Sequence, residues 1–303
     1  MSKYKRHIFQ FIATFIYNPH VANLVSGKIY RGMTKSVCVP GINCYSCPAA
    51  MGACPVGSFQ SFLAGFAPKF PAYVIGLTAL FGLALGRMIC GWGCPFGALQ
   101  EIIYKIPSPK IGKSGMTFKL SKMKYVIALL FVIVLPLIFW KATGIGVTTF
   151  CKFICPAGTV EGAVPLFIAN EKLRAAAGYI TAWKFFLLAL IMLAMVFVFR
   201  PFCRFFCPLG AFYGLFNKYS YFGIKIDSHK CVSCGQCKRV CKMDIKIAGD
   251  GECVSCGECL GSCPTGAIYY KSRRKNDEKN YEKNDCRGDG HGGLDAFSDC
   301  SEL

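Results

Sequence analysis

The sequence predicts an α-helical membrane protein of about four transmembrane helices, arranged as a pseudo-twofold repeat, with a small cysteine-rich α+β domain near its C-terminal end. Three observations support this fold class. The 303 residues are 53% hydrophobic and only 17% charged, and the apolar residues are gathered into runs. One cysteine motif recurs at the ends of these runs, and two dense cysteine motifs follow the last of them.

The chain has a formal net charge of +19 and 20 cysteines. Such a charge can indicate nucleic-acid binding. Here the basic residues flank the apolar runs, which predicts a lipid bilayer as the partner and excludes nucleic acid. Most cysteines fall within motifs, and this favours metal clusters on a reducing face over the disulfides of a secreted protein.

Four apolar segments are expected to cross the bilayer. They are residues 7–25, 70–86, 125–140 and 180–199. The first segment follows a basic N-terminal start, and no signal-peptide cleavage site follows it. Pro19 interrupts this segment. Because this start and the Lys-rich loop 100–124 indicate the cytoplasmic side, both termini are expected in the cytoplasm, in a multi-pass protein of the cell (plasma) membrane.

The two dense motifs share the spacing C-x2-C-x2-C-x3-C, the bacterial ferredoxin pattern for two [4Fe–4S] clusters. Each cluster takes three cysteines from one motif and the fourth from the other. The expected ligand sets are Cys231, Cys234, Cys237 and Cys263, and Cys253, Cys256, Cys259 and Cys241. Gly235 and Gly257 should let the backbone fold around each cluster. Zinc would need cysteine pairs rather than two interleaved quartets, and disulfides are the other alternative.

These motifs define a two-cluster ferredoxin domain at 221–271, between a transmembrane region at 1–220 and a disordered polar tail at 272–303. The tail carries two isolated cysteines, Cys286 and Cys300, without a metal-binding pattern.

The motif C-P-x-G recurs in the transmembrane region at 54–57, 94–97, 155–158 and 207–210. A cysteine precedes the last three copies by four residues, which gives C-x3-C-P. Each half, about 38–110 and 145–220, therefore has a Cys-Pro loop, an apolar span and a C-x3-C-P loop, the pattern of an internal repeat.

The predicted topology sorts these cysteines by side. The cytoplasmic edge has four thiols, enough for one [4Fe–4S] cluster between the halves: Cys90, Cys94, Cys203 and Cys207. The opposite edge has Cys38, Cys44, Cys47, Cys54, Cys151 and Cys155. The expected outer ligands are Cys47, Cys54, Cys151 and Cys155, with Cys44 as the alternative to Cys47. Each half could instead bind its own cluster through a re-entrant loop, and the outer cysteines could form disulfides or remain inert buried thiols.

The segments CGWGCPFGALQ and FCRFFCPLGAFYG, both after apolar spans and upstream of the dense motifs, resemble those of the NapH/NosR-like membrane polyferredoxins. The resemblance covers about residues 1–270. It implies four spans, cytoplasmic termini and electron transfer between a quinol pool or cytosolic donor and a redox partner. The stretch 38–54 and the pair Cys151 and Cys155 go beyond the minimal NapH pattern, and the covalent-flavin domain of NosR has no counterpart here.

Other redox chemistry is not indicated. A transmembrane haem needs paired histidines within spans, and the chain has four histidines in all. No dinucleotide fingerprint occurs. Glu161 and Glu171 are candidates to accept quinol protons, although a solvated surface is the simpler expectation for both.

The expected function is therefore a membrane-bound iron–sulfur relay, an electron-transfer subunit rather than a stand-alone enzyme. Its partners would be a cytosolic donor or acceptor on one side, and quinone or a membrane or extracytoplasmic redox protein on the other. Two alternatives use the same cysteines. One is a redox sensor or metalloenzyme maturation factor that acts as a metal reductase, and the other is a structural or metal-storage protein.

Overall fold

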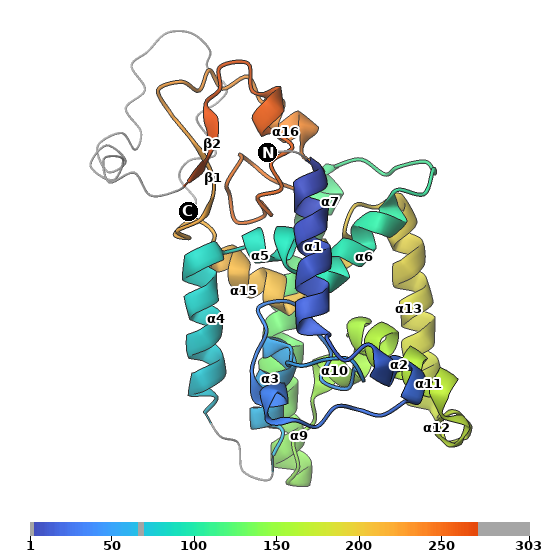
Figure 1. Cartoon of the computed structure of the whole chain (residues 1–303). Helices are drawn as coiled ribbons and strands as arrows, with labels where there is room; N and C mark the ends of the chain where they lie inside the picture. Colours follow the sequence, from blue (N-terminus) through green and yellow to red (C-terminus); the bar gives the residue numbers. More distant parts are fainter. Residues whose placement is uncertain (1–2, 66–69, 272–303) are drawn as a thin grey trace. The chain divides into compact units, whose positions relative to one another are not determined.

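The computed structural model describes residues 3–65 and 70–271, which belong to one compact unit that ends at Lys271 (Figure 1). This unit is mostly helical. The predicted tail 272–303, with Cys286 and Cys300, lies outside the described residues.

The N-terminal segment forms α1 (Lys3–Tyr17), α2 (Ala22–Ser26), the 3-10 helix η1 (Met33–Ser36) and α3 (Pro55–Leu63). The predicted span 7–25 is therefore divided, because α1 ends before Pro19. With 15 residues, α1 rises about 22 Å, less than the roughly 30 Å of a bilayer core. One face of α1 is fixed by polar contacts: Gln10 Nε2 donates to the Gly91 carbonyl at 2.7 Å.

Two helices within the described residues are long and apolar enough to cross a membrane. One runs over Gly115–Thr143 and comprises α7 (Gly115–Ser121), α8 (Met123–Ile127), η2 (Ala128–Val134) and α9 (Leu135–Thr143). The other is α13 (Tyr179–Phe197). These contain most of the third and fourth predicted spans. The second predicted span corresponds to α4 (Ala72–Leu85), which has 14 residues and is shorter than a transmembrane helix requires.

A π-helical stretch, η2, interrupts the longer apolar helix. Pro136 follows it and has no N–H to donate, so the α-helical hydrogen-bond register breaks there. The Phe131 carbonyl in η2 instead accepts from Gln60 Nε2 at 2.7 Å and from the Thr149 hydroxyl. These two bonds tie the long helix to α3 and to α10 (Thr149–Phe153).

The Cys-Pro motifs start short helices. Cys54, Cys94 and Cys207 are the N-cap residues of α3, α6 (Pro95–Tyr104) and α15 (Pro208–Phe216), each with proline in the first turn. Proline suits this position because its fixed φ is helical and its missing N–H would have no helical partner. The sulfur of each cysteine therefore lies at the positive end of a helix, where a thiolate is favoured.

The remaining helices are short. They are α5 (Met88–Trp92), η3 (Gly158–Ala163), α11 (Val164–Ala169), α12 (Glu171–Ala175), α14 (Pro201–Phe205), α16 (Gln236–Val240) and η4 (Leu260–Ser262).

A two-stranded antiparallel sheet closes the dense cysteine region at both of its ends. Strand β1 (Gly223–Ile226) pairs with β2 (Ile268–Lys271), with Gly223 opposite Lys271 and Ile226 opposite Ile268. The strands enclose α16 and η4, which gives residues 223–271 the mixed α+β character predicted for them. In Figure 1 this part lies on the side of the unit near α5 and α7, away from α9 and α12.

Candidate metal centre

Both dense motifs contain CVSCG, and the structure bends both copies in the same way. In the first copy φ is 49° at Ser233 and 67° at Gly235. In the second it is 50° at Ser255 and 84° at Gly257. The two glycines therefore have the special conformation expected of them, and the two serines add a second left-handed residue. Such turns direct backbone N–H groups toward one side and are typical of anion and Fe–S sites.

The two motifs are interleaved in space. Cys241 of the first motif lies beside Cys253 and Cys256 of the second, and burial raises its pKa to about 12. Cys237 and Cys263 pack against a smaller cluster that also contains Cys259 of the second motif. The contacts of Cys241 are compatible with crossed ligand sets, in which each motif contributes its last cysteine to the other motif's group, and these sets stay a prediction.

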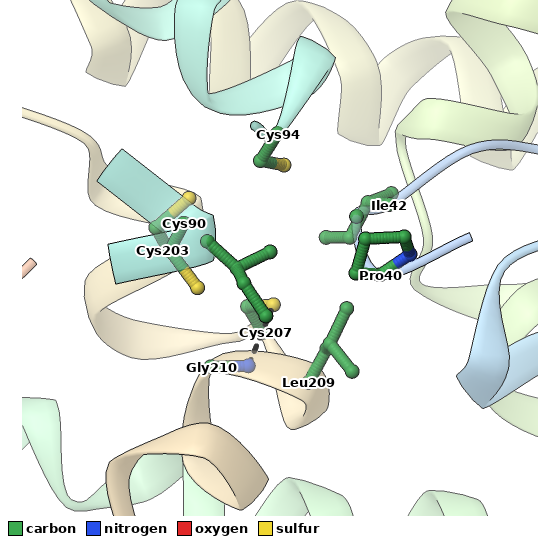
Figure 2. Close-up of a pocket in the computed structure, with 10 residues that line it drawn as sticks. Pro40, Ile42, Cys90, Cys94, Cys203, Cys207, Leu209 and Gly210 are labelled. Atoms are coloured by element: carbon green, nitrogen blue, oxygen red, sulfur yellow. Dashed lines mark hydrogen bonds between the residues drawn. The ribbon is translucent and has the colours of Figure 1, made fainter. Parts of the chain in front are cut away.

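Four cysteines from two of the three C-x3-C-P motifs surround one small enclosed space, as Figure 2 shows. They are Cys90, Cys94, Cys203 and Cys207. Pro40, Ile42 and Leu209 line the rest of it, so its walls are apolar apart from the sulfurs. Its volume of about 10 Å³ is far below the roughly 300–1,000 Å³ of pockets for organic ligands. The four thiols therefore favour an inorganic cluster over an organic ligand at this place.

Two N–H groups point at sulfurs of this inner quartet. The Gly210 amide lies 3.2 Å from Cys207 Sγ, and Gln100 Nε2 lies 3.0 Å from Cys203 Sγ. Burial raises the pKa values of Cys90, Cys94 and Cys207 above the ordinary range, so these thiols are protonated without a metal. Metal binding must therefore displace protons here, as is general for thiolate ligands.

A second group of cysteines gathers around a larger, open cavity of about 990 Å³. Its cysteines are Cys44, Cys54, Cys151 and Cys155. A Cβ at Gly57 would lie 3.7 Å from Cys151 Sγ, and one at Gly158 would lie 3.4 Å from Cys44 Sγ. At these two C-P-x-G motifs, 54–57 and 155–158, the glycine thus lies next to a cysteine of the other half, which makes Cys44 the counterpart of Cys151. Burial raises the pKa of both Cys44 and Cys54 to about 12, and the nearby Lys184 partly offsets this for Cys44.

Cys47, which the sequence favoured over Cys44, does not line this cavity. Its sulfur lies 3.8 Å from Asn18 Oδ1, and its carbonyl accepts from the buried Lys35 ammonium at 3.0 Å. Cys38 is also buried and does not line this cavity; its backbone forms an isolated β-bridge with Ala53. The structure therefore brings the sequence's alternative, Cys44, into the outer set. All cysteines of the described residues are free thiols, which disfavours the disulfide alternative.

Two buried glutamines support these sites and were not singled out from the sequence. Gln60 Oε1 accepts from the Cys151 amide at 3.3 Å, and Gln100 Oε1 accepts from the Phe202 amide at 3.1 Å. Each thus links one half to a cysteine loop of the other. Both occupy the same place in C-P-x-G-x-x-Q, at 54–60 and 94–100, and this repeated spacing is the signal that could have identified them.

The two carboxylates considered as acceptors of quinol protons, Glu161 and Glu171, differ in their burial. The Cys44 amide donates to Glu161 Oε2 at 2.7 Å, and burial raises the pKa of Glu161 to about 7. Glu161 is therefore not the solvated surface group that the sequence suggested. Glu171 is exposed and pairs with Arg174, as expected for a surface residue.

The ferredoxin part contacts the inner quartet through the second dense motif. Trp92 Nε1, on α5, donates to the Ser255 carbonyl at 2.9 Å. At Gly91, next to Cys90, a Cβ would lie 2.1 Å from the Val254 carbonyl, so only glycine permits this approach. The backbone around Cys253 and Cys256 therefore lies directly against the helix that carries Cys90.

Among the residues that the structure describes, no three His, Cys, Asp or Glu side chains converge as tightly as one metal ion requires. A [4Fe–4S] cluster makes a different demand, because its four ligands bind four separate iron atoms and lie farther apart.

Comparison with known proteins agrees with this chemistry. A family model described as a 4Fe-4S binding domain matches residues 52–73, 66–114 and 180–226, which include the cysteines of the inner quartet. Protein MJ0750 of Methanocaldococcus jannaschii is 31% identical over 64% of this chain and 74% of its own. No solved structure matches the chain.

Two further relatives have informative names. YccM of Escherichia coli (strain K12), named as an electron transport protein, is 24% identical over 62% of this chain and 51% of its own. The methylamine utilization ferredoxin-type protein MauN of Methylobacillus flagellatus is 25% identical over 55% of this chain and 51% of its own. The chain thus contains 4Fe–4S binding domains, and it belongs to the NapH/NosR-like polyferredoxin family.

Proposed function

We propose that the chain is a membrane-bound relay that carries electrons between a cytosolic redox partner and quinone or a membrane or extracytoplasmic redox protein. The observation that carries the proposal is the inner cysteine quartet, which two C-x3-C-P motifs enclose and whose helix α5 contacts the ferredoxin part through Trp92. When bound, [4Fe–4S] clusters supply one-electron transfer without proton chemistry. Two clusters would occupy the dense motifs, and one or two more would occupy the membrane-edge quartets.

The contacts suggest an order for the sites. The loop with Cys253 and Cys256 lies against α5, next to the inner quartet. Cys234, in the other dense motif, is exposed. The set with Cys231, Cys234, Cys237 and Cys263 is therefore the point at which a cytosolic partner exchanges electrons. The outer set, in its open cavity, would serve quinone or an extracytoplasmic partner.

The proposed topology has four spans, with the ferredoxin domain and both termini in the cytoplasm. Because a bilayer core is about 30 Å thick, sites at both edges would divide the crossing into shorter steps. A helical region 1–220 would contain both quartets, and residues 221–271 would form the cytoplasmic domain.

Vesicles test the whole proposal. Anaerobically loaded protein is reconstituted into liposomes that contain a redox dye, and dithionite is added outside. The dye should become reduced in vesicles with protein and stay oxidised in vesicles without it. No dye reduction by protein that carries about sixteen irons, four for each of four clusters, would contradict the proposal.

A pair of single variants tests the outer ligand set. Cys44→Ala should lower the iron content by about four per chain, because it removes one thiol from the outer quartet. Cys47→Ala is the matched control, three residues away and buried, and should keep all the iron. Iron and labile sulfide are measured on anaerobically purified protein. Loss of iron in the Cys47 variant alone would assign the ligand as the sequence first suggested.

A further inference from the structure

Two arginines occupy equivalent places beside the inner quartet. Arg87 and Arg200 each precede the first cysteine of a C-x3-C-P motif by three residues, so that R-x2-C-x3-C-P-x-G occurs at 87–97 and again at 200–210. Both side chains are fully buried. The positive-inside rule explains basic residues at the ends of apolar spans that remain in water, and it does not explain these two.

Their contacts are reciprocal. Arg200 Nη1 donates to the Cys90 carbonyl at 2.6 Å, and Arg87 Nη2 donates to the Cys203 carbonyl at 3.3 Å. Each guanidinium thus reaches from its own half to the first cysteine of the other half. The backbone at Arg200 has φ of 48°, in the left-handed region that a residue other than glycine rarely adopts. Such a conformation persists where surrounding contacts hold it in place.

The glycines of the two C-P-x-G motifs leave room for these arginines. A Cβ at Gly97 would lie 3.0 Å from the Cys90 carbonyl and 3.4 Å from Arg200 Nη1. A Cβ at Gly210 would lie 3.4 Å from the Cys203 carbonyl and 3.5 Å from Arg87 Nη2. The arginine, the carbonyl and the glycine therefore form the same local arrangement twice.

Carboxylates hold both guanidinium groups. Arg200 Nε donates to Glu101 Oε1 at 3.0 Å, and Arg6 binds the same oxygen, so this group of three keeps one excess positive charge. Arg87 pairs with Glu252, which Lys124 also binds, and the nearby Asp250 carboxylate adds a further negative charge there. Both guanidinium groups still place a positive charge beside the quartet. Four thiolates on an iron–sulfur core form a negatively charged site, and nearby net charge is one of the factors that set its reduction potential.

We propose that Arg87 and Arg200 are a pair of positioning residues, which hold Cys90 and Cys203 across the contact between the two halves and raise the reduction potential of the inner site through their charge. This rests on the proposed function, because it requires a [4Fe–4S] cluster in the inner quartet. A purely structural arginine would affect the amount of cluster bound but not its potential.

An EPR-monitored redox titration of the intact chain distinguishes the two roles. In Arg87→Gln and in Arg200→Gln, the ratio of reduced to oxidised inner cluster at a fixed potential should fall about tenfold, which is 59 mV for a one-electron couple. Arg87→Lys and Arg200→Lys keep the charge and should recover most of the shift. Glu101→Gln frees positive charge and should shift the potential upward, which gives a test even where a glutamine variant fails to bind the cluster.

The matched control is the double variant Arg204→Gln with Asp244→Asn, which removes a buried ion pair without changing the net charge. Arg204 follows Cys203 in the chain, pairs with Asp244 and donates to the Phe199 carbonyl rather than to a cysteine carbonyl. Loss of this pair should lower stability and leave the inner potential unchanged. Unshifted potentials in both Arg87→Gln and Arg200→Gln, or an equal shift in the double variant, would overturn the inference. Wild-type protein without any inner signal would instead refute the proposed function.

Discussion

Replacing Cys90 and Cys203 together by alanine should remove about four irons per chain and stop dye reduction inside vesicles. Two of the four thiols around the inner space are then missing, and the remaining two cannot hold a cubane. The eight cysteines of the dense motifs are untouched, so their EPR signals should persist. Iron analysis, EPR and the vesicle assay on the same preparation measure the three effects.

Cys38→Ala provides the control for this experiment. Cys38 is a buried cysteine that lines neither the inner space nor the outer cavity. Its replacement should keep the iron content and the rate of dye reduction. If the double variant still reduced the dye at the wild-type rate, electrons would not pass the inner quartet and the proposed order of sites would be wrong.

Glu252→Gln should destabilise the protein by about 3–5 kcal/mol, the usual effect of removing one partner from a buried ion pair. Glu252 is the shared carboxylate of Arg87 and Lys124, both of which are fully buried. Without it, two cations remain in the interior with no counter-charge at this point. Denaturant unfolding in detergent, followed by the near-UV signal, measures the loss.

Glu258→Gln is the matched control on the same domain. Its pair with Lys242 has side-chain exposures of 38% and 19%, so solvent screens it. Its loss should cost less than about 1 kcal/mol. An equal loss of stability in both variants would show that the Glu252 network has no special role.

The effect of Glu252→Gln should depend on pH. Burial opposes ionisation of Glu252, but Arg87 and Lys124 outweigh it and lower its pKa. A carboxylate whose pKa is lower in the folded state stabilises the protein above its unfolded pKa, about 4.3, and loses this contribution as pH falls through the folded pKa. The difference between wild type and variant should be constant near pH 7 and narrow below about pH 4. A difference that stayed constant to low pH would exclude the carboxylate charge as its source.

Cysteine spacing predicted much of the candidate sites because cluster ligation imposes it directly on the chain. The interleaving of Cys241 with Cys253 and Cys256 follows from the motif alone. The positions of the C-x3-C-P motifs relative to the apolar runs predicted which four cysteines would gather around the inner space: Cys90, Cys94, Cys203 and Cys207. The choice between Cys44 and Cys47 could not be made this way. They lie three residues apart in a loop without helix or strand, where no periodicity indicates which side chain faces the cavity.

Hydropathy was a weaker guide. It joined residues 7–25 into one span, although Pro19 ends the helix that precedes it. It also gives no sign that Arg87 and Lys124 are buried and paired with Glu252, more than 120 residues later in the chain. A scale that scores each residue alone cannot distinguish a solvated cation from one that a distant carboxylate neutralises.

The pairing of Arg87 and Lys124 with Glu252 has a consequence for biosynthesis. The N-terminal part of a chain is made and folds first, so both cations exist before the ribosome has produced their carboxylate. Until residue 252 emerges, the helices around the inner cysteines carry uncompensated charge and cannot close in their final form. We therefore expect the inner quartet to reach its final arrangement only after residue 252 has been synthesised.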